Sequence, residues 1–259
     1  MLEQKKVIVS LTSFPAATPY VKDAIKSILA GNTLPDKLVL YLTFSQFEDR
    51  KIPLELIALA KDNPLFEIRN YNEDIRSYRK LIPALKDFPN DIIVTVDDDV
   101  KYHKKMLRDL LYLHKQIPEV IIANRAKKIK LNMPYRQWKK YRWYHFFTKR
   151  LNFSFKNIQT GVGGVLYPPN SLDQEMMDSD IFKEIAPTTD DIWFWAAAVA
   201  KGTYVVPFPF GKHNKPRGLK KPKKLSLKTV NFKKGTDLNR LAFEKILEKY
   251  PTVKKRMML

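Results

Sequence analysis

The stretch Ile92-Ile93-Val94-Thr95-Val96-Asp97-Asp98-Asp99 runs from apolar residues directly into three carboxylates. The apolar part is β-branched and too short for a typical helix, so it predicts a buried strand. The acids then lie at the rim of a sheet, where they repel one another unless a cation or hydrogen bonds compensate. Such oxygen clusters suit Mg²⁺ or Mn²⁺, often shared with a phosphate ligand. The alternative is a solvated loop whose acids cap the following segment.

Strands and helices alternate on the N-terminal side of this stretch. Strands are predicted over 6–12, 38–42 and 66–71, and helices over 20–30, 54–61 and 78–85. This order predicts an α/β fold with a mostly parallel sheet and helices on both faces. Ligands of such sheets bind outside the carboxyl ends of the strands. Thr12-Ser13-Phe14 and Asp97-Asp98-Asp99 both follow strands, so we expect them to line one crevice.

The second half of the chain is less regular. Helices are predicted over 106–114, 190–200 and 237–250, and strands over 120–123 and 205–210, with an irregular segment rich in Lys and Pro over 211–234. No linker is long enough to separate independent domains, which predicts one domain over residues 1–259.

Composition narrows the class of protein. Zero cysteines among 259 residues exclude a disulfide scaffold, a thiolate zinc site and a cysteine nucleophile. No apolar run is long enough for a membrane span, and the N-terminus lacks the apolar region of a signal peptide, which predicts a cytosolic protein. Lysine and arginine number 47 against 27 acids, for a formal charge of +20. Such a surface attracts nucleic acid, anionic lipid or phosphorylated substrates.

Basic and aromatic residues interleave between Lys127 and Arg150. Two interpretations are open. The segment is either a mobile cover over bound ligands that excludes water, or a fixed surface subdomain whose aromatic side chains pack on the core.

Five segments, in this order, resemble those of GT-A-fold glycosyltransferases, and more narrowly the bacterial enzymes of lipopolysaccharide or capsule glycan biosynthesis. They are Ser10–Pro15, Asp74–Leu81, Asp97–Asp99, Gly161–Gly164 and Thr189–Trp193. The resemblance implies a hexosyltransferase that depends on Mn²⁺ or Mg²⁺. It would move a sugar, with inversion, from a UDP-hexose or UDP-N-acetylhexosamine to a hydroxyl of a growing surface glycan. Residues 1–100 would bind the nucleotide sugar, and residues 101–259 would hold the acceptor and the catalytic groups. Lipid-linked acceptors would place the enzyme peripherally on the cytoplasmic face of the inner membrane.

The resemblance also assigns donor-binding and metal roles. Asp99 would contact the metal and Asp97 the metal or the ribose. Asp98 belongs to the same nucleotide-binding motif, although alternation along a strand would turn its side chain the other way. The other donor-binding residues implied are Thr12, Ser13 and Phe14 at the nucleoside floor, Asp74 for the uracil N–H, Tyr78 for stacking, and Lys80 for ribose or phosphate. A core role for Phe14 is the alternative.

The remaining roles concern catalysis and the sugar. Gly163 and Gly164 would let a sugar approach the backbone, with Trp193 in the same subsite, although an ordinary turn is the alternative. Asp191 would be the general base, with Asp190 as the other candidate, because the family places an acidic pair there. Both acids also suit a helix N-terminus without any catalytic role. His213 would complete the metal shell, unless it is simply an exposed histidine.

Two other classes of protein compete with this interpretation. The basic aromatic segment could bind nucleic acid, with the acidic cluster acting as a metal-dependent phosphodiesterase. The C-terminal Lys254-Lys255-Arg256-Met257-Met258-Leu259, behind an amphipathic helix, could instead make a catalytically silent membrane-surface protein.

Overall fold

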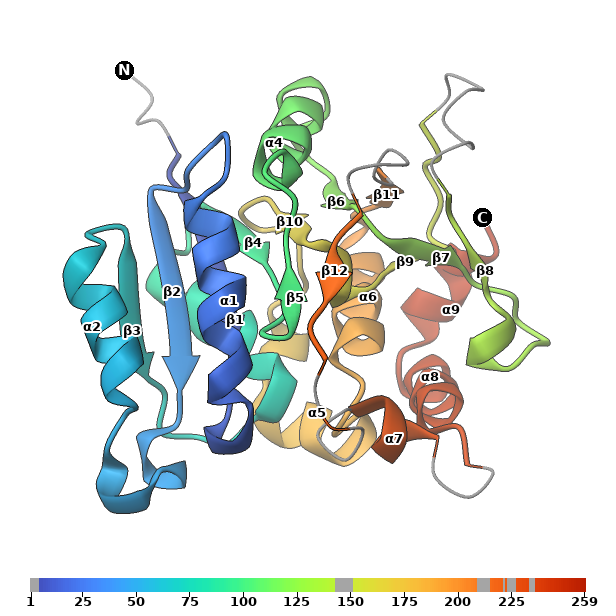
Figure 1. Cartoon of the computed structure of the whole chain (residues 1–259). Helices are drawn as coiled ribbons and strands as arrows, with labels where there is room; N and C mark the ends of the chain where they lie inside the picture. Colours follow the sequence, from blue (N-terminus) through green and yellow to red (C-terminus); the bar gives the residue numbers. More distant parts are fainter. Residues whose placement is uncertain (1–4, 143–150, 209–214, 221, 223–226, 233–235) are drawn as a thin grey trace.

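The computed structural model describes residues 5–142, 151–208, 215–220, 222, 227–232 and 236–259. Four parallel strands form the N-terminal half of a central sheet (Figure 1). They are β1 (Val7–Thr12), β2 (Lys37–Leu42), β3 (Phe66–Asn70) and β4 (Ile92–Thr95). The helices between them are α1 (Thr18–Leu29), α2 (Leu54–Asp62) and α3 (Ile82–Asp87), the last preceded by the 3₁₀ helix η4 (Arg76–Lys80). The α/β fold with a mostly parallel sheet is therefore confirmed.

The second half of the chain completes the same sheet with β6 (Ile121–Ala123), β10 (Val165–Tyr167) and β11 (Val205–Pro207). The strand order is β11-β6-β10-β4-β1-β2-β3, and β10 runs antiparallel to both of its neighbours. The first residue of β10, Val165, therefore pairs with Thr95 at the end of β4 and with Ala123 at the end of β6. This reversal brings the glycine-rich loop before β10 to the edge where the parallel strands end.

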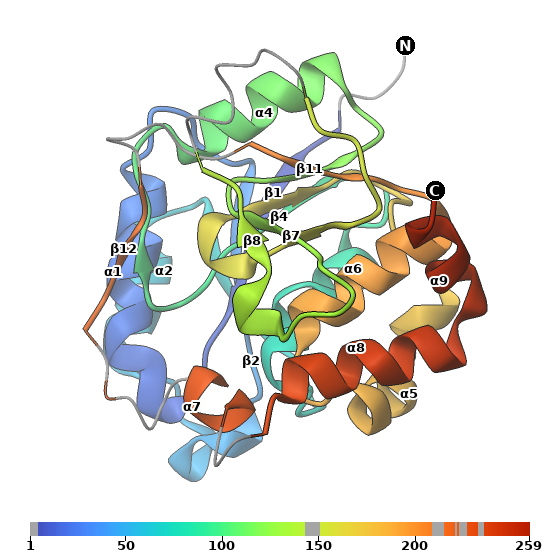
Figure 2. The same cartoon turned by 90° about the vertical axis from the view of Figure 1, so that its right-hand side faces the viewer.

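Helices cover both faces of the sheet, as Figure 2 shows with α1 on one side and α6 (Asp190–Lys201) and α8 (Leu238–Lys249) on the other. Successive strand residues point to opposite faces. Val9 and Val94 accordingly pack with α1, α2 and α4 (Met106–Gln116), whereas Ile8 and Ile93 pack with α3, α6 and α8. Two hydrophobic cores thus hold the sheet between them.

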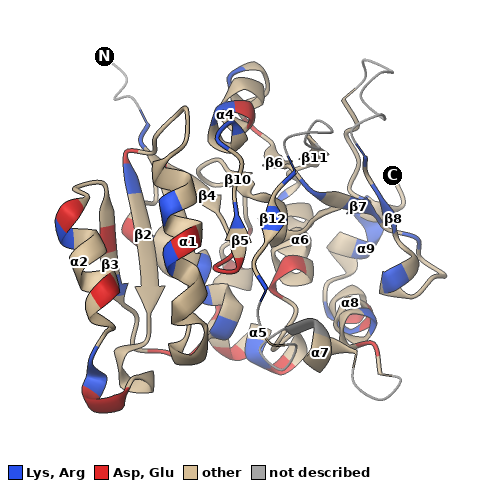
Figure 3. Cartoon of the chain, in the orientation of Figure 1, with Lys and Arg blue, Asp and Glu red and all other residues tan. Residues whose placement is uncertain are grey.

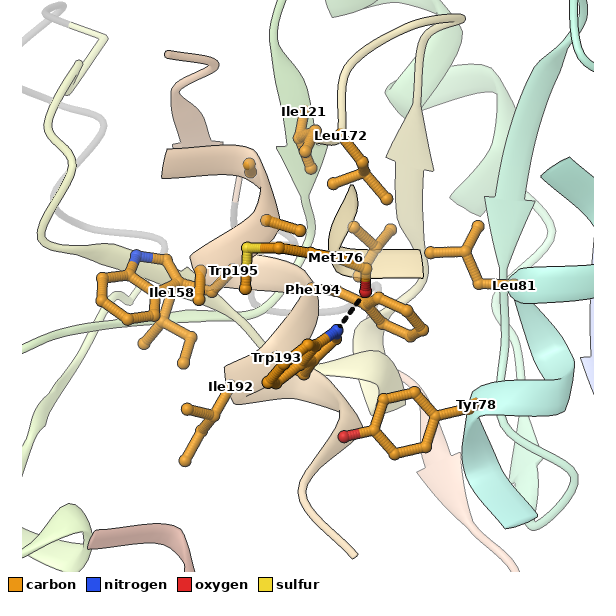
Figure 4. Close-up of a cluster of buried hydrophobic side chains, with 14 of the residues drawn as sticks. Tyr78, Leu81, Ile121, Ile158, Leu172, Met176, Ile192, Trp193, Phe194 and Trp195 are labelled. Carbon is orange, nitrogen blue, oxygen red and sulfur yellow. Dashed lines mark hydrogen bonds between the residues drawn. The ribbon is translucent and has the colours of Figure 1, made fainter. Parts of the chain in front are cut away.

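Helix α6 lies at the centre of the second core (Figure 4). Trp193, Phe194 and Trp195 on this helix are all buried, and the indole N–H of Trp193 donates to the carbonyl oxygen of Met176 at 2.6 Å. Packing of this kind fixes the helix axis, and with it the position of the two acids at its N-terminus. Gly202 ends the helix in the left-handed conformation, with φ of 92°, that glycine adopts without strain.

Several element boundaries differ from the prediction because prolines intervene. The helix predicted over 78–85 is η4 followed by α3, with Pro83 in the first turn of α3. The amphipathic segment 237–250 is α8, and a separate helix α9 (Pro251–Met257) begins at the next residue. Tyr250 is non-helical because the residue before a proline is disfavoured in the α region. The strand predicted over 205–210 ends at Pro207.

Two smaller sheets were not predicted, since their strands are too short for a periodic signal. One joins β7 (Ala126–Lys128), β8 (Lys139–Lys140) and β9 (Asn157–Gln159), and the other joins β5 (Val100–Lys101) to β12 (Arg217–Gly218). Two short helices, α5 (Ser179–Ile185) and α7 (Leu227–Asn231), were also missed. Part of the segment predicted to be irregular therefore forms β12 and α7.

The described part of the basic aromatic segment, up to Arg142, packs on the core. Trp138 is 2% exposed, and its ring meets that of Phe243 on α8 at 5.1 Å. Its indole N–H donates to the carbonyl oxygens of Lys130 and Met133, each at 3.1 Å. These contacts agree with the fixed subdomain of the two interpretations. Residues 143–150 lie outside the described residues.

Within the part of the chain that the structure describes, none of the helices has the length and apolar character needed to cross a bilayer.

Candidate active site

The two strand ends predicted to share a crevice are in contact. The hydroxyl of Ser13, after β1, donates to Asp98 Oδ2, after β4, at 2.6 Å. Because β1 and β4 are adjacent and parallel, their carboxyl ends meet at one edge of the sheet. The N-terminus of α6 and the 3₁₀ turn η7 (Gly161–Gly163) lie at the same place, as the contacts below establish.

Lys80, at the end of η4, contacts both the acidic run after β4 and the N-terminus of α6. Its ammonium lies 2.9 Å from Asp97 Oδ1 and 3.0 Å from Asp190 Oδ2. The side chains of Lys80 and Asp190 are only 8% and 9% exposed, whereas that of Asp97 is 28% exposed. Burial alone would lower the pKa of Lys80, but the charges of Asp190 and Asp97 outweigh it and raise that pKa well above its usual value. Lys80 is therefore a fixed cation at the centre of the site.

Asp190 and Asp191 differ in the hydrogen bonds and ion pairs that their carboxylates form. Asp190 accepts a hydrogen bond from the Ser77 hydroxyl at 2.8 Å in addition to its ion pair with Lys80. Asp191 is partly exposed, and its Oδ1 accepts from the backbone N–H of Gly161 at 3.0 Å. Burial and the charge of Asp190 raise the pKa of Asp191 to about 7, against the opposing effect of Lys80. Asp191 is therefore the better proton acceptor near neutral pH.

The glycine that faces these side chains is Gly161. A methyl group on its Cα would lie 2.5 Å from Lys80 Nζ and 3.0 Å from Asp97 Oδ1. Gly163 and Gly164, predicted to face the sugar, are required at their positions by the local backbone and packing. A Cβ on Gly163 would meet the Cβ of Arg125 at 2.7 Å, and Gly164 has φ of 84°. The glycine of this loop that faces the carboxylates is therefore Gly161, and the sugar contact predicted for Gly163 and Gly164 stays a prediction.

The acidic run has the donor chemistry for a divalent cation. Asp97, Asp98 and Asp99 are all partly exposed, and their carboxylate oxygens are ligands that Mg²⁺ and Mn²⁺ accept. In the described ranges, groups of three or more His, Asp or Glu side chains that could hold a metal do not occur. Mg²⁺ commonly takes only one or two carboxylates and fills its shell with water and substrate phosphates, so this donor set fits. His213, predicted as a further ligand, lies outside the described residues.

The loop predicted to be the nucleoside floor is held by a buried cation that the sequence interpretation missed. Arg79 is 2% exposed, and it donates from Nε to Thr12 Oγ1 at 2.8 Å and from a terminal nitrogen to the Ser13 carbonyl oxygen at 2.7 Å. It also bonds Thr43 at the end of β2. Arg79 thus fixes the loop that leads to Phe14, whose ring is partly exposed. An arginine in a basic sequence gives no sign that it is buried.

The other donor-binding predictions have different outcomes. Asp74 is exposed, and its Oδ1 accepts from the backbone N–H of Arg76 at 3.1 Å, so its carboxylate is accessible from solvent. Tyr78 is 1% exposed, its ring stacks on Phe182 at 4.1 Å, and its hydroxyl donates to the Ala186 carbonyl oxygen. The stacking role predicted for Tyr78 is wrong, since its ring is covered by protein.

Trp193 is likewise corrected. It belongs to the core around α6 rather than to a sugar subsite, because two residues along a helix place it on the opposite side of the helix from Asp191. Trp193 in Figure 4 lies beside Met176 and Ile192.

Replacement of Lys80 by Met is expected to destabilise the protein by about 3–5 kcal/mol, because it leaves Asp190 buried without its counter-ion. Urea unfolding followed by tryptophan fluorescence measures this loss. The double variant Lys80→Met/Asp190→Asn should recover a large part of it, since no isolated charge then remains. Equal stability of the wild type and the single variant would contradict the buried ion pair.

No family model and no curated protein matches this sequence. Solved structures do match. The mannosyltransferase PcManGT from Pyrobaculum calidifontis, solved with GDP-Man and Mn²⁺, aligns with a TM-score of 0.55 and 14% identity over 98% of this chain and 74% of that chain. Residues 1–349 of S. aureus TarS align with a TM-score of 0.50 and 10% identity over 83% of this chain. The match spans 60% of the TarS chain. This chain has a GT-A-like glycosyltransferase fold.

Proposed function

We propose that the protein is a metal-dependent glycosyltransferase that moves a sugar from a nucleotide-sugar donor to an acceptor hydroxyl. The observation that carries the proposal is the convergence of Asp97 and Asp191 around Lys80 and Gly161 at the carboxyl edge of the sheet. Transfer of a sugar needs positive charge beside the leaving diphosphate and a base beside the acceptor hydroxyl. The carboxyl edge of the sheet has residues for both roles in contact with one another.

The residues at the carboxyl edge of the sheet have separate roles in binding the donor and the cation. Thr12, Ser13 and Phe14 form the floor for the nucleoside, and Arg79 holds that floor in place. Asp97 and Asp99 would hold the cation, which would supply positive charge to neutralise that of the leaving diphosphate. Asp98 secures β4 to β1 through Ser13.

Asp191 accepts the proton of the acceptor hydroxyl as that oxygen attacks the anomeric carbon. Direct attack in one displacement inverts the configuration at that carbon. The Gly161 N–H orients Asp191 through Oδ1, and Asp190 keeps Lys80 in position beside it. The surroundings of Asp191 raise its pKa, and a carboxylate with a raised pKa is a stronger base for removing the acceptor proton.

The finer assignments belong to the same proposal. The donor is a UDP-hexose or UDP-N-acetylhexosamine, bound by residues 1–100. The acceptor is a growing surface glycan such as lipopolysaccharide, bound by residues 101–259. The enzyme works at the cytoplasmic face of the inner membrane as a peripheral protein. The +20 charge of the chain supports a position near an anionic surface.

A screen of UDP- and GDP-sugars with Mn²⁺, read out as released nucleotide, tests the proposal. Metal-dependent release from one donor, stimulated by a glycan, is the expected result. Cleavage of an oligonucleotide without turnover of any sugar nucleotide would instead favour the metal-dependent phosphodiesterase.

The pH dependence of kcat/KM is expected to show an acidic limb with a midpoint near pH 7. The ratio kcat/KM reports the essential base of the free enzyme, and Asp191 must be deprotonated to act. Because its pKa is raised to about 7, the rate should rise as pH increases through that value. An ordinary aspartate would put this limb near pH 4. Steady-state rates between pH 5 and 9 measure it, and a flat profile down to pH 5 would count against Asp191 as the base.

A further inference from the structure

A hollow lined by lysines lies on the small sheet formed by β7, β8 and β9. It has a volume of about 180 Å³ and is lined by Lys128, Lys139, Lys140, Tyr141 and Asn152. Figure 3 shows Lys and Arg along β7 and β8, on the side of the molecule away from α2 and β3. None of the donor-binding or catalytic assignments uses this hollow.

The wall of the hollow is fixed by hydrogen bonds beneath it. The Tyr141 hydroxyl lies 2.8 Å from Asn157 Oδ1 and 3.0 Å from Asn152 Oδ1. Asn157 is fully buried and donates from Nδ2 to the carbonyl oxygens of Asn152 and Val205. Tyr141 and Asn152 are therefore held against the main body of the protein. The lysine side chains add charge to a surface that is already shaped.

Among the residues that the structure describes, Lys128, Lys139 and Lys140 form no salt bridge with a carboxylate. Lys128 pairs with Lys139 across the β7–β8 ladder, so these two like charges stand opposite one another. Burial and the charge of Lys156 both lower the pKa of Lys128. Gathering cations without counter-ions is costly, and a bound anion would relieve that cost.

The hollow is connected to the segment that carries the proposed base through strands β7 and β9. Ala126 pairs with Gln159, whose side-chain amide donates to the backbone carbonyl oxygen of Asp191 at 3.1 Å. Lys128 pairs with Asn157, two residues further along the same strands. Two strand residues span about 7 Å, so Lys128 lies roughly that far along β7 from the pair that contacts the backbone of Asp191.

We propose that this lysine-lined hollow on β7 and β8 binds an anionic group, a phosphate or a carboxylate, of the glycan acceptor. The proposal rests on the glycosyltransferase function proposed above and adds the class of acceptor. Both anionic groups accept hydrogen bonds from ammonium donors, which the three lysines that line the hollow supply. A neutral glycan would leave the lysine charges uncompensated.

Backbone amide shifts of the ¹⁵N-labelled full chain test the proposal without any turnover. Inorganic phosphate, glucuronate and neutral glucose are titrated separately, with no nucleotide sugar or metal present. Phosphate, glucuronate or both should produce saturable shifts at Lys128 and Lys139–Tyr141, and glucose should not. The apparent affinity should fall as NaCl is raised from about 50 to 200 mM.

The variant Lys139→Gln/Lys140→Gln should weaken that binding by roughly fivefold or more, because it removes two cations from the hollow. Both side chains are exposed, so the fold should survive. The matched control is Lys61→Gln/Lys115→Gln, which removes two exposed cations from α2 and α4 and should bind like the wild type.

The outcomes separate the two proposals. A response to phosphate alone or to glucuronate alone identifies the anionic group and supports the site. No saturable shift, or an equal loss in both double variants, overturns it. Micromolar binding of an oligonucleotide at these lysines without binding of either anion also overturns it, in favour of nucleic acid. Anion binding here without turnover of any sugar nucleotide would leave the site standing and reject the glycosyltransferase.

Discussion

Asp191→Asn is expected to lower kcat by roughly 10²-fold or more, the usual contribution of a general base. Asparagine keeps the shape of aspartate and can still accept the hydrogen bond from Gly161, but it cannot take a proton. Donor affinity should change little, because the base acts on the acceptor hydroxyl. Released nucleotide measured at saturating donor gives kcat, and a nucleotide titration gives the affinity.

The matched control is Asp190→Asn, one residue earlier on the same helix. Asp190 is paired with Lys80 and Ser77, so its loss should disturb the position of Lys80 and reduce stability. The acidic limb of the pH profile should persist in this variant, at lower pH because the charge of Asp190 no longer raises the pKa of Asp191, and should vanish in Asp191→Asn. An inactive Asp190→Asn beside a fully active Asp191→Asn would assign the base to the earlier residue.

Removal of divalent metal with EDTA is expected to abolish transfer, and added Mn²⁺ or Mg²⁺ should restore it. The reason is that a dianionic diphosphate has to leave from an edge that carries three carboxylates, which repel it unless a cation intervenes. Asp99→Ala should lose metal-dependent nucleotide binding while it remains folded, since Asp99 is partly exposed and contributes little to the core.

Isothermal titration of UDP, with and without Mn²⁺, measures this dependence. Asp62→Ala, which removes an exposed acid at the end of α2, should bind like the wild type. Full activity in EDTA would remove the basis for placing metal on Asp97 and Asp99. A normal Mn²⁺ dependence of UDP binding in Asp99→Ala would remove Asp99 alone.

The sequence by itself predicted the α/β class and the edge of the sheet at which a ligand would bind. Both follow from local patterns, because β-branched runs that end in polar residues mark the carboxyl ends of strands. The contact of Ser13 with Asp98 confirms that these two strand ends meet at one edge of the sheet. The acidic pair at the start of α6 was equally visible, and the family resemblance favoured Asp191 over Asp190 as the base.

Only the tertiary structure decided which side chains face the site. Tyr78, Arg79 and Lys80 are consecutive, yet one stacks in the core, one supports the loop after β1 and one pairs with two carboxylates. A 3₁₀ turn points neighbouring side chains in different directions, and no periodic pattern reveals which direction each takes. The role of Gly161 could not be predicted because its partner Asp191 is 30 residues away in the sequence. The lysine-lined hollow could not be predicted because its residues come from separate strands. Contacts between segments distant in sequence depend on how the helices and strands pack. That packing places Asp190 beside Lys80 and Ser77, and Asp191 beside Gly161.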